Sequence, residues 1–244
     1  NKENIPINGY NNNNSKNDVC SACFDGQISD DNPIIFCDIC NSGSHKYCYG
    51  INKIPAENEE WLCDACKYFI DTNKRPKCCV CPMHGCILKQ INNDTFIHMS
   101  CALLINGIII ADIITMKPIY NIIDTKMKQI KNIQGIYLKN IKQLYRQQSN
   151  DVMNKYDHGC SICKSKDGLF VKCNEKNCDK MFHLLCLWFN GQYIHIDFDR
   201  QNGSIIKEFY CKKHTPKQYG GSNRDLHHFI KVRNNFRSHL SYGE

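Results

Sequence analysis

The sequence predicts a small, zinc-stabilised, irregular α+β fold made of tandem modules. Three observations predict it. Twenty Cys and His residues fall into three clusters with the spacing of metal ligands, and together they make five sets of four. The residues between the ligands are too few to bury a large apolar core in each module, so metal ions must supply part of the folding free energy. Only Cys79 and Cys86 remain outside the sets among the 18 cysteines.

The cysteine content is compatible with either disulfides or metal sites. Disulfides need an oxidising compartment, and no apolar signal segment opens the chain. Repeated C-x2-C pairs accompanied by H-x2-C favour zinc, and hence a reducing cytosol or nucleus. No stretch approaches the roughly 20 apolar residues of a membrane span. Because the chain begins with Asn1 rather than Met, we expect it to be a segment of a larger protein.

Charge is distributed unevenly along the chain, whose net charge is +7. Residues 1–66 carry 4 basic and 10 acidic side chains, residues 67–150 carry 12 and 4, and residues 151–244 carry 15 and 10. An acidic first module joined to a basic remainder suggests two partners of opposite charge. Solubility alone is the simpler interpretation of the same pattern.

Composition and ligand positions divide the chain into seven segments. The Asn-rich start lacks apolar periodicity and is expected to be disordered. The cysteine-free connector begins with Ile-rich runs typical of short buried strands, and a basic helix is expected to follow from Asp124. The predicted segments are a leader (1–17), a first module (18–67), a linker (68–77), a second module (78–104), the connector (105–159), a third module (160–216) and a basic tail (217–244).

The first cluster reads C-x2-C-x13-C-x2-C-x4-H-x2-C-x14-C-x2-C. Four cysteines precede the histidine, whereas a RING finger places its histidine fourth, which argues against a RING-type ubiquitin ligase. With Trp61 two residues before the seventh ligand, the cluster resembles a PHD finger. The resemblance implies two interleaved zinc sites, one made by Cys20, Cys23, His45 and Cys48 and the other by Cys37, Cys40, Cys63 and Cys66.

The second cluster reads C-x2-C-x16-H-x2-C, from Cys78, Cys81, His98 and Cys101. Its surroundings, CCVCPMHGCILKQ and FIHMSCALL, resemble the zinc knuckle that follows the first finger in PHD–knuckle–PHD proteins. Cys79 competes with Cys78 as a ligand, and the spacing to Cys81 favours Cys78. We expect Cys86 and His84 to be packing or surface residues.

The third cluster reads C-x2-C-x9-C-x4-C-x4-H-x2-C-x24-C-x2-H and resembles an extended PHD finger, whose last ligand is His. The same interleaving implies one site from Cys160, Cys163, His183 and Cys186 and another from Cys173, Cys178, Cys211 and His214. Residues 18–216 are thus similar to the PHD–zinc knuckle–extended PHD (PZP) modules of bromodomain–PHD scaffolds, Jade proteins and leukaemia-fusion partners. The connector is longer than is usual there. Five Zn²⁺ ions are expected.

A zinc ion with four protein ligands has no open position for a substrate water, so we expect the metals to be structural. The sequence shows no nucleophile with an orienting base and no phosphate-cradling glycine loop. It therefore predicts a binding module rather than an enzyme, with no small-molecule substrate and no membrane partner.

The resemblance implies a nuclear chromatin reader, since PHD fingers bind the amino terminus of histone H3 as an added β-strand. Ile34, Ile35 and Phe36 would form the receiving strand. Asp38 matches the position that engages the second-residue arginine of the tail, and Asp18 one that engages an unmodified fourth-residue lysine. Either aspartate could equally be a solvated surface residue.

Recognition of trimethyl-lysine needs an aromatic cage. The family's cage tryptophan, two residues before the histidine ligand, is Gly43 here, and Val19 precedes the first cysteine. No cage is visible, so we expect a preference for H3 that is unmethylated at its fourth residue.

The basic remainder implies non-specific contact with nucleosomal DNA through the third module, as in similar modules. The alternative is a protein–protein scaffold that binds other subunits of a chromatin complex without touching the histone. The candidate DNA contacts are Lys164, Lys166, Lys172, Lys176, Lys180, Lys212 and Lys213.

Overall fold

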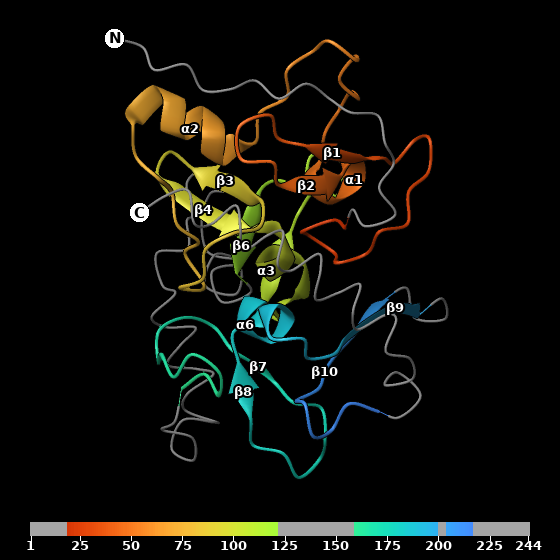
Figure 1. Cartoon of the computed structure of the whole chain (residues 1–244), viewed down its shortest axis with the longest axis vertical. Helices are drawn as coiled ribbons and strands as arrows, with labels where there is room; N and C mark the ends of the chain where they lie inside the picture. The colour runs from red at the N-terminus through yellow and green to blue at the C-terminus, as the bar shows by residue number, and fades with distance from the viewer. Residues whose placement is uncertain (1–18, 122–158, 200–203, 217–244) are drawn as a thin grey trace, which may run out of the picture.

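The computed structural model describes residues 19–121, 159–199 and 204–216. Its elements are short and follow one another as small hairpins and helices around a shared interior (Figure 1). In chain order they are β1 (Ile34–Phe36), β2 (Gly43–His45), α1 (Lys46–Tyr49), α2 (Asp64–Thr72), β3 (Leu88–Asn92), β4 (Thr95–His98), α3 (Met99–Leu104), β5 (Ile108–Ile110), β6 (Ile119–Asn121), β7 (Val171–Lys172), β8 (Met181–Phe182), α6 (Leu184–Phe189), β9 (Ile194–Asp199) and β10 (Ser204–Phe209).

Within residues 19–121, 159–199 and 204–216, the strands form five separate two-stranded antiparallel sheets, in which each strand pairs with its neighbour in the sequence. The pairs are β1–β2, β3–β4, β5–β6, β7–β8 and β9–β10. A two-stranded hairpin is marginally stable by itself, so each depends on what holds its ends. This arrangement confirms the predicted class of small, irregular, zinc-binding fold with a few short strands and helices.

One local unit occurs three times. A hairpin strand leads into a histidine, this histidine is the N-cap residue of a short helix, and a cysteine follows in the first helical turn. N-cap and first-turn side chains lie at the same end of a helix, which brings the two side chains of H-x2-C to one point. The three pairs are His45 and Cys48 at α1, His98 and Cys101 at α3, and His183 and Cys186 at α6.

The three modules share one hydrophobic core. The knuckle lies between the fingers in Figure 1, with α3 packed against α6. Leu169 N–H donates a 2.7 Å hydrogen bond to Val80 O, and this bond joins the third module to the second. Phe24 of the first module stacks on Trp188 of the third, with ring centroids 4.2 Å apart. The modules therefore form one body.

Tyr49 connects the first module to the second and is only 3% exposed. Its hydroxyl donates to Leu88 O (2.9 Å) and accepts from Asp64 N–H (2.8 Å). The Lys89 ammonium donates to Tyr49 O at 2.6 Å and lies 4.2 Å from the centroid of the tyrosine ring. Burial lowers the pKa of Lys89 to about 8. This buried polar contact fixes how α1 sits on β3.

The connector begins by packing against the first module. Gly50, the C-cap of α1, has φ +72°, and a Cβ there would lie 2.4 Å from the carbonyl carbon and oxygen of Thr115. Such close backbone approach and a positive φ both require glycine. The expected Ile-rich strands are present as β5 and β6, although β5 is half-buried rather than buried.

Several expectations fall outside the described residues. These are the disordered leader, Asp18, the basic helix from Asp124 and the basic tail. The helix α2 crosses the boundary expected between residues 67 and 68, so the linker begins inside a helix. In the described part of the chain, no helix has the length and apolar character needed to span a membrane.

Tyr49→Phe tests the contact between the first two modules. The change leaves the Leu88 carbonyl and Asp64 N–H, which belong to half-buried residues, without their partner, and this should lower the free energy of unfolding by about 1–3 kcal/mol. Urea denaturation at a fixed zinc excess measures this loss. The control is Tyr68→Phe, because the Tyr68 hydroxyl bonds to Asp94 at an exposed position. Equal stability of both variants would contradict the assignment.

Candidate metal centres and binding surface

The structure brings together the four residues of every predicted ligand set, and in each group the ligand atoms all lie within 4.8 Å of one another. The first module carries two interleaved groups, the second carries one, and the third carries two. The groups are Cys20, Cys23, His45 and Cys48; Cys37, Cys40, Cys63 and Cys66; Cys78, Cys81, His98 and Cys101; Cys160, Cys163, His183 and Cys186; and Cys173, Cys178, Cys211 and His214.

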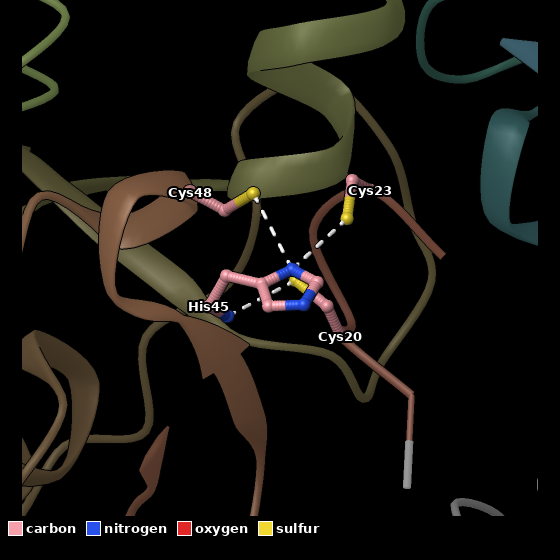
Figure 2. A group of neighbouring side chains, drawn as sticks. All are labelled: Cys20, Cys23, His45 and Cys48. Carbon is pink, nitrogen blue, oxygen red and sulfur yellow. Dashed lines mark hydrogen bonds between the residues drawn. The ribbon is translucent and has the colours of Figure 1, made fainter. Parts of the chain in front are cut away.

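The first group shows how a ligand histidine is oriented, with its Nδ1 toward the cysteine sulfurs (Figure 2). His45 Nδ1 lies 3.3 Å from Cys23 Sγ and 3.8 Å from Cys48 Sγ, while its Nε2 lies 2.7 Å from Gln27 O. A backbone carbonyl on Nε2 holds the proton there and leaves the Nδ1 lone pair free for a metal. His183 repeats this arrangement with Asp167 O on Nε2 (2.5 Å) and Cys163 Sγ near Nδ1 (3.3 Å).

The distances within the groups fit tetrahedral zinc. With Zn–S near 2.3 Å and Zn–N near 2.0–2.1 Å, a tetrahedron places two sulfurs about 3.8 Å apart and sulfur and nitrogen about 3.5 Å apart. The Sγ atoms of Cys40 and Cys63 lie 3.8 Å apart, as do those of Cys81 and Cys101. A disulfide would require about 2.05 Å. The residues present therefore fit zinc and not disulfides.

Backbone N–H groups also point at the sulfurs. His45 N–H donates to Cys20 Sγ at 3.3 Å and Cys63 N–H donates to Cys37 Sγ at 3.4 Å. The second module has the same bond to Cys78 and the third has it to Cys173. Such donors favour the thiolate form, which is the form that binds zinc.

The sulfurs of one group cannot all ionise by themselves. Hydrogen bonds from Cys40, Cys63 and Cys66 push the pKa of Cys37 far below its usual value. Hydrogen bonding to Cys37, Cys40 and Cys66 raises the pKa of Cys63 far above it. A divalent cation at the centre would stabilise all four thiolates together. When bound, zinc supplies this charge and cross-links the chain.

The remaining candidates lie outside the five groups. Cys79 is half-buried next to Cys78, and its N–H donates to Phe96 O at 2.8 Å. Cys86 is buried, and His84 is exposed. These positions agree with packing or surface roles.

The strand β1 offers a free edge. Its residue Ile35 faces Ser44 of β2, and Cys37 N–H continues the ladder to Ser42 O at 3.1 Å. Hydrogen-bonded and non-hydrogen-bonded residue pairs alternate along antiparallel strands, so the N–H and C=O groups of Ile34 and Phe36 point away from β2. Within the described ranges, no strand pairs with that side. The edge can accept another strand.

Neighbouring side chains cover Gly43, which stands at the position of the family's cage tryptophan. A Cβ on Gly43 would lie 2.5 Å from the Phe36 ring and 2.9 Å from Cγ2 of Ile34. Two β1 side chains therefore occupy the space above this glycine. The buried Val19 precedes the first ligand.

Exposed carboxylates stand at both ends of β1. Asp38 follows the strand, and its Oδ2 accepts from Trp61 N–H at 2.7 Å while its own N–H donates to Trp61 O. Asp30 and Asp31 precede it and are exposed. Sequence reasoning missed this acidic pair, which is separated from β1 by Asn32 and Pro33, although two adjacent aspartates so close to a strand were a usable signal. Asp18 lies outside the described residues.

All seven lysines proposed for DNA contact are exposed. Lys172 lies in β7 and the other six lie in loops and turns of the third module, where Lys164 Nζ donates to Ser161 O at 2.9 Å. Sequence reasoning missed Lys207, a half-buried lysine of β10 whose ammonium donates to Leu103 O at 2.5 Å.

Two family profiles match the chain. The "PHD-finger" profile matches residues 31–67, and the "PHD-like zinc-binding domain" profile matches residues 98–215. The fold is similar to the crystal structure of the zebrafish PHF14 PZP module, with a TM-score of 0.57, 22% identity, and coverage of 91% of this chain and 97% of that one. The chain has the architecture of a PZP module.

Relatives of this PZP module include Jade-1 of Xenopus laevis, which is 31% identical over 197 residues. Human bromodomain and PHD finger-containing protein 3 is 30% identical over 205 residues. The alignments cover 80% and 81% of this chain but only 20% and 14% of the two relatives. The PZP module therefore corresponds to a small part of each relative.

Cys78→Ser and Cys79→Ser, compared side by side, test the choice of ligand in the knuckle. Cys78→Ser removes one of four ligands, so zinc content should fall by about one ion per chain. Cys79→Ser should retain the wild-type content, because Cys79 belongs to no group. Native mass spectrometry counts the ions, and the reverse result would assign the site to Cys79.

Proposed function

We propose that this PZP module is a nuclear chromatin reader that holds the histone H3 tail on its first finger and DNA on its extended PHD finger. Five structural zinc ions, one per ligand group, would hold both fingers in shape. The observation that carries the proposal is the free edge of β1 with carboxylates at both of its ends. Other subunits of a chromatin complex would bind the same module or its flanking segments.

The β1 edge suits an extended basic peptide. The N–H and C=O groups of Ile34 and Phe36 would pair with a strand running antiparallel to β1. In that direction the start of the peptide lies near Asp38 and its later residues lie near Asp30 and Asp31. Asp38 would engage the second-residue arginine, because the hydrogen bond from Trp61 N–H to Asp38 Oδ2 holds the carboxylate in place. Asp18 and the acidic pair would attract the fourth-residue lysine.

The carbonyls of residues 55–59 would receive the free amine of the tail. This loop is held in a turn, in which Glu59 N–H donates to Ala56 O at 2.9 Å and the Glu59 carboxylate accepts from Ala56 N–H at 3.2 Å. A turn closed by two hydrogen bonds can present its remaining carbonyls in a fixed direction.

A preference for the unmethylated tail follows from the side chains around β1. Trimethyl-lysine is stabilised by aromatic faces, and unmethylated lysine by hydrogen bonds and charge. The space above Gly43 is taken by Phe36 and Ile34, and the adjacent acidic groups can pair with an ammonium.

DNA contact would use exposed lysines of the extended PHD finger. Their ammonium groups can neutralise phosphates without reading bases, which gives affinity without sequence preference. The zinc groups themselves would take no part in binding or chemistry, because four protein ligands close each tetrahedron.

Histone binding can be tested with H3 tail peptides and Asp38→Asn. The amide retains an oxygen for Trp61 N–H but loses the charge, so affinity for the unmodified tail should fall about 10-fold. Asp94→Asn, outside the first finger, is the matched control and should bind like wild type. Isothermal titration gives the affinities. Tighter binding of the fourth-residue trimethylated peptide by the wild type would refute the predicted preference.

DNA binding can be tested by its salt dependence. Combined Lys164→Ala, Lys166→Ala and Lys180→Ala changes should reduce the slope of log affinity against log salt by about 0.9 for each lost phosphate contact. The triple change Lys53→Ala, Lys67→Ala and Lys74→Ala, at exposed positions in and after the first finger, is the control. Fluorescence anisotropy with duplex DNA provides the slopes. If neither H3 nor DNA binds the folded module, the scaffold alternative replaces this proposal.

A further inference from the structure

The extended PHD finger repeats a double hydrogen bond of the first finger, with an amide in place of the carboxylate. In the first finger, Trp61 N–H donates to the Asp38 side chain (2.7 Å), and Asp38 N–H donates to Trp61 O (3.1 Å). In the third module, Phe209 N–H donates to Asn174 Oδ1 (2.8 Å), and Asn174 N–H donates to Phe209 O (2.8 Å). Since Oδ1 is held in this way, the Nδ2 donors are the part of the Asn174 side chain left for a ligand. A carboxylate in one finger is thus replaced by a neutral donor in the other.

A groove of about 470 Å³ opens beside this contact and is called here the β7–β10 groove. The strands β7, β8 and β10 lie together below α6 in the lower half of Figure 1. Phe170, Met181 and Phe209 form the apolar part of its lining, and Asn106, in the turn after α3, lines it from the second module. Its volume falls in the range of pockets that hold small ligands.

Positive charge predominates among the residues that line the groove. Three lysines and one exposed carboxylate are present: Lys172, Lys176, Lys207 and Glu175. Lys172 is already engaged in another contact. The ammonium groups that can serve a ligand are therefore those of Lys176, which is exposed, and Lys207, which is half-buried.

Lys207 carries a charge that the protein does not balance. Its ammonium has three N–H donors, and one of them is used by Leu103 O of α3, which fixes the side chain at the wall of the groove. Within residues 19–121, 159–199 and 204–216, Lys207 forms no ion pair with a carboxylate. Burial lowers its pKa, because removal from water disfavours the charged form. Charges withdrawn from water are ordinarily paired in proteins, so this ammonium is suited to an anion supplied by a ligand.

We propose that the β7–β10 groove binds a phosphate monoester carried on a side chain of a peptide, with its oxygens held by the ammonium groups of Lys207 and Lys176 and by the side-chain amide of Asn174. A phosphorylated side chain brings a charge of about −1.5 to −2 and three strong acceptor oxygens, which match two cations and an amide donor. The apolar lining would contact the residues next to the phosphorylated one. The site is independent of the proposed H3 site, which lies on the first finger.

The burial of Lys207 favours a phosphopeptide over duplex DNA. Each phosphate of DNA is linked to two sugars, carries one charge and stays within the helix backbone. A phosphate monoester stands at the end of a flexible side chain, so it can enter a concave site and reach a half-buried ammonium. The exposed lysines proposed for DNA contact need no such entry.

The probe is a fluorescein-labelled, amidated peptide Gly-Leu-Val-phosphoserine-Val-Leu-Gly, compared with the same peptide carrying unmodified Ser. Anisotropy titration of the zinc-loaded full chain should show saturable binding of the phosphorylated peptide, at least about 10-fold tighter than that of the unmodified one. Inorganic phosphate should displace the peptide only well above the Kd of the peptide, because the free anion makes no contact with the apolar lining.

Asn174→Asp tests the groove without disturbing its frame. The aspartate retains an oxygen for Phe209 N–H, as Asp38 does for Trp61 N–H, but it adds a negative charge beside the bound phosphate. Affinity for the phosphorylated peptide should fall at least about 10-fold. Asn177→Asp, the same substitution at an exposed position outside the groove lining, is the matched control and should bind like wild type.

Lys207→Gln and Lys207→Arg test the half-buried ammonium. Glutamine keeps a donor for Leu103 O but removes the charge, so affinity for the phosphorylated peptide should fall at least about 10-fold. Arginine keeps the charge and should stay within about threefold of wild type. Zinc content by native mass spectrometry and the urea midpoint, measured on every variant, report whether the fold is intact.

The proposal is overturned if the phosphorylated and unmodified peptides bind alike, or if neither binds. It is also overturned if Asn174→Asp retains full affinity in a zinc-loaded chain. Inorganic phosphate that binds as tightly as the peptide would assign the groove to a free anion instead. Duplex DNA binding that is lost in Asn174→Asp, without discrimination between the two peptides, would assign the groove to nucleic acid.

Discussion

The rest of the structure depends on the tetrahedral geometry that four Cys and His side chains must adopt around one zinc ion. Each ligand group brings together chain segments that are distant in the sequence, such as Cys37 and Cys63 or Cys173 and Cys211. The neighbouring backbone follows, so Asp38 reaches Trp61 and Asn174 reaches Phe209. Hairpins of two to six residues per strand would not persist without such anchors. The free edge of β1 is therefore a by-product of the metal sites.

The zinc knuckle turns two fingers into one body. Tyr49 bonds to Leu88 on one side of the knuckle, and Leu169 bonds to Val80 on the other. The stacked rings of Phe24 and Trp188 join the fingers directly. Because these contacts are buried, the two fingers are held in a fixed relation to each other. Two independently folded fingers on a flexible linker would not be held in this way.

Ligand spacing predicted the metal sites well, because a single tight turn places two ligands that are three residues apart next to each other whatever the rest of the fold. The preference for Cys78 over Cys79 and the interleaved pairs agree with the groups that the structure brings together. Periodicity was a weak guide, since strands of two or three residues are too short to show any. The buried contact between Tyr49 and Lys89 went unseen because it joins residues that are 40 positions apart in the sequence. The helix α2 across the expected linker was also missed.

The sequence by itself determined the fold class, the identity of the ligand residues and the contrast between an acidic first finger and a basic remainder, whereas the interleaved grouping of the ligands came from the resemblance to PHD fingers. These follow from side-chain chemistry and short-range spacing, which folding does not alter. Only the tertiary structure decided that Phe36 and Ile34 cover Gly43, that Asp30 and Asp31 flank β1, and that Lys207 joins Lys172 and Lys176 around a groove. These contacts form between backbone segments that are distant in the sequence, and the zinc ligands and the shared core determine which segments lie together.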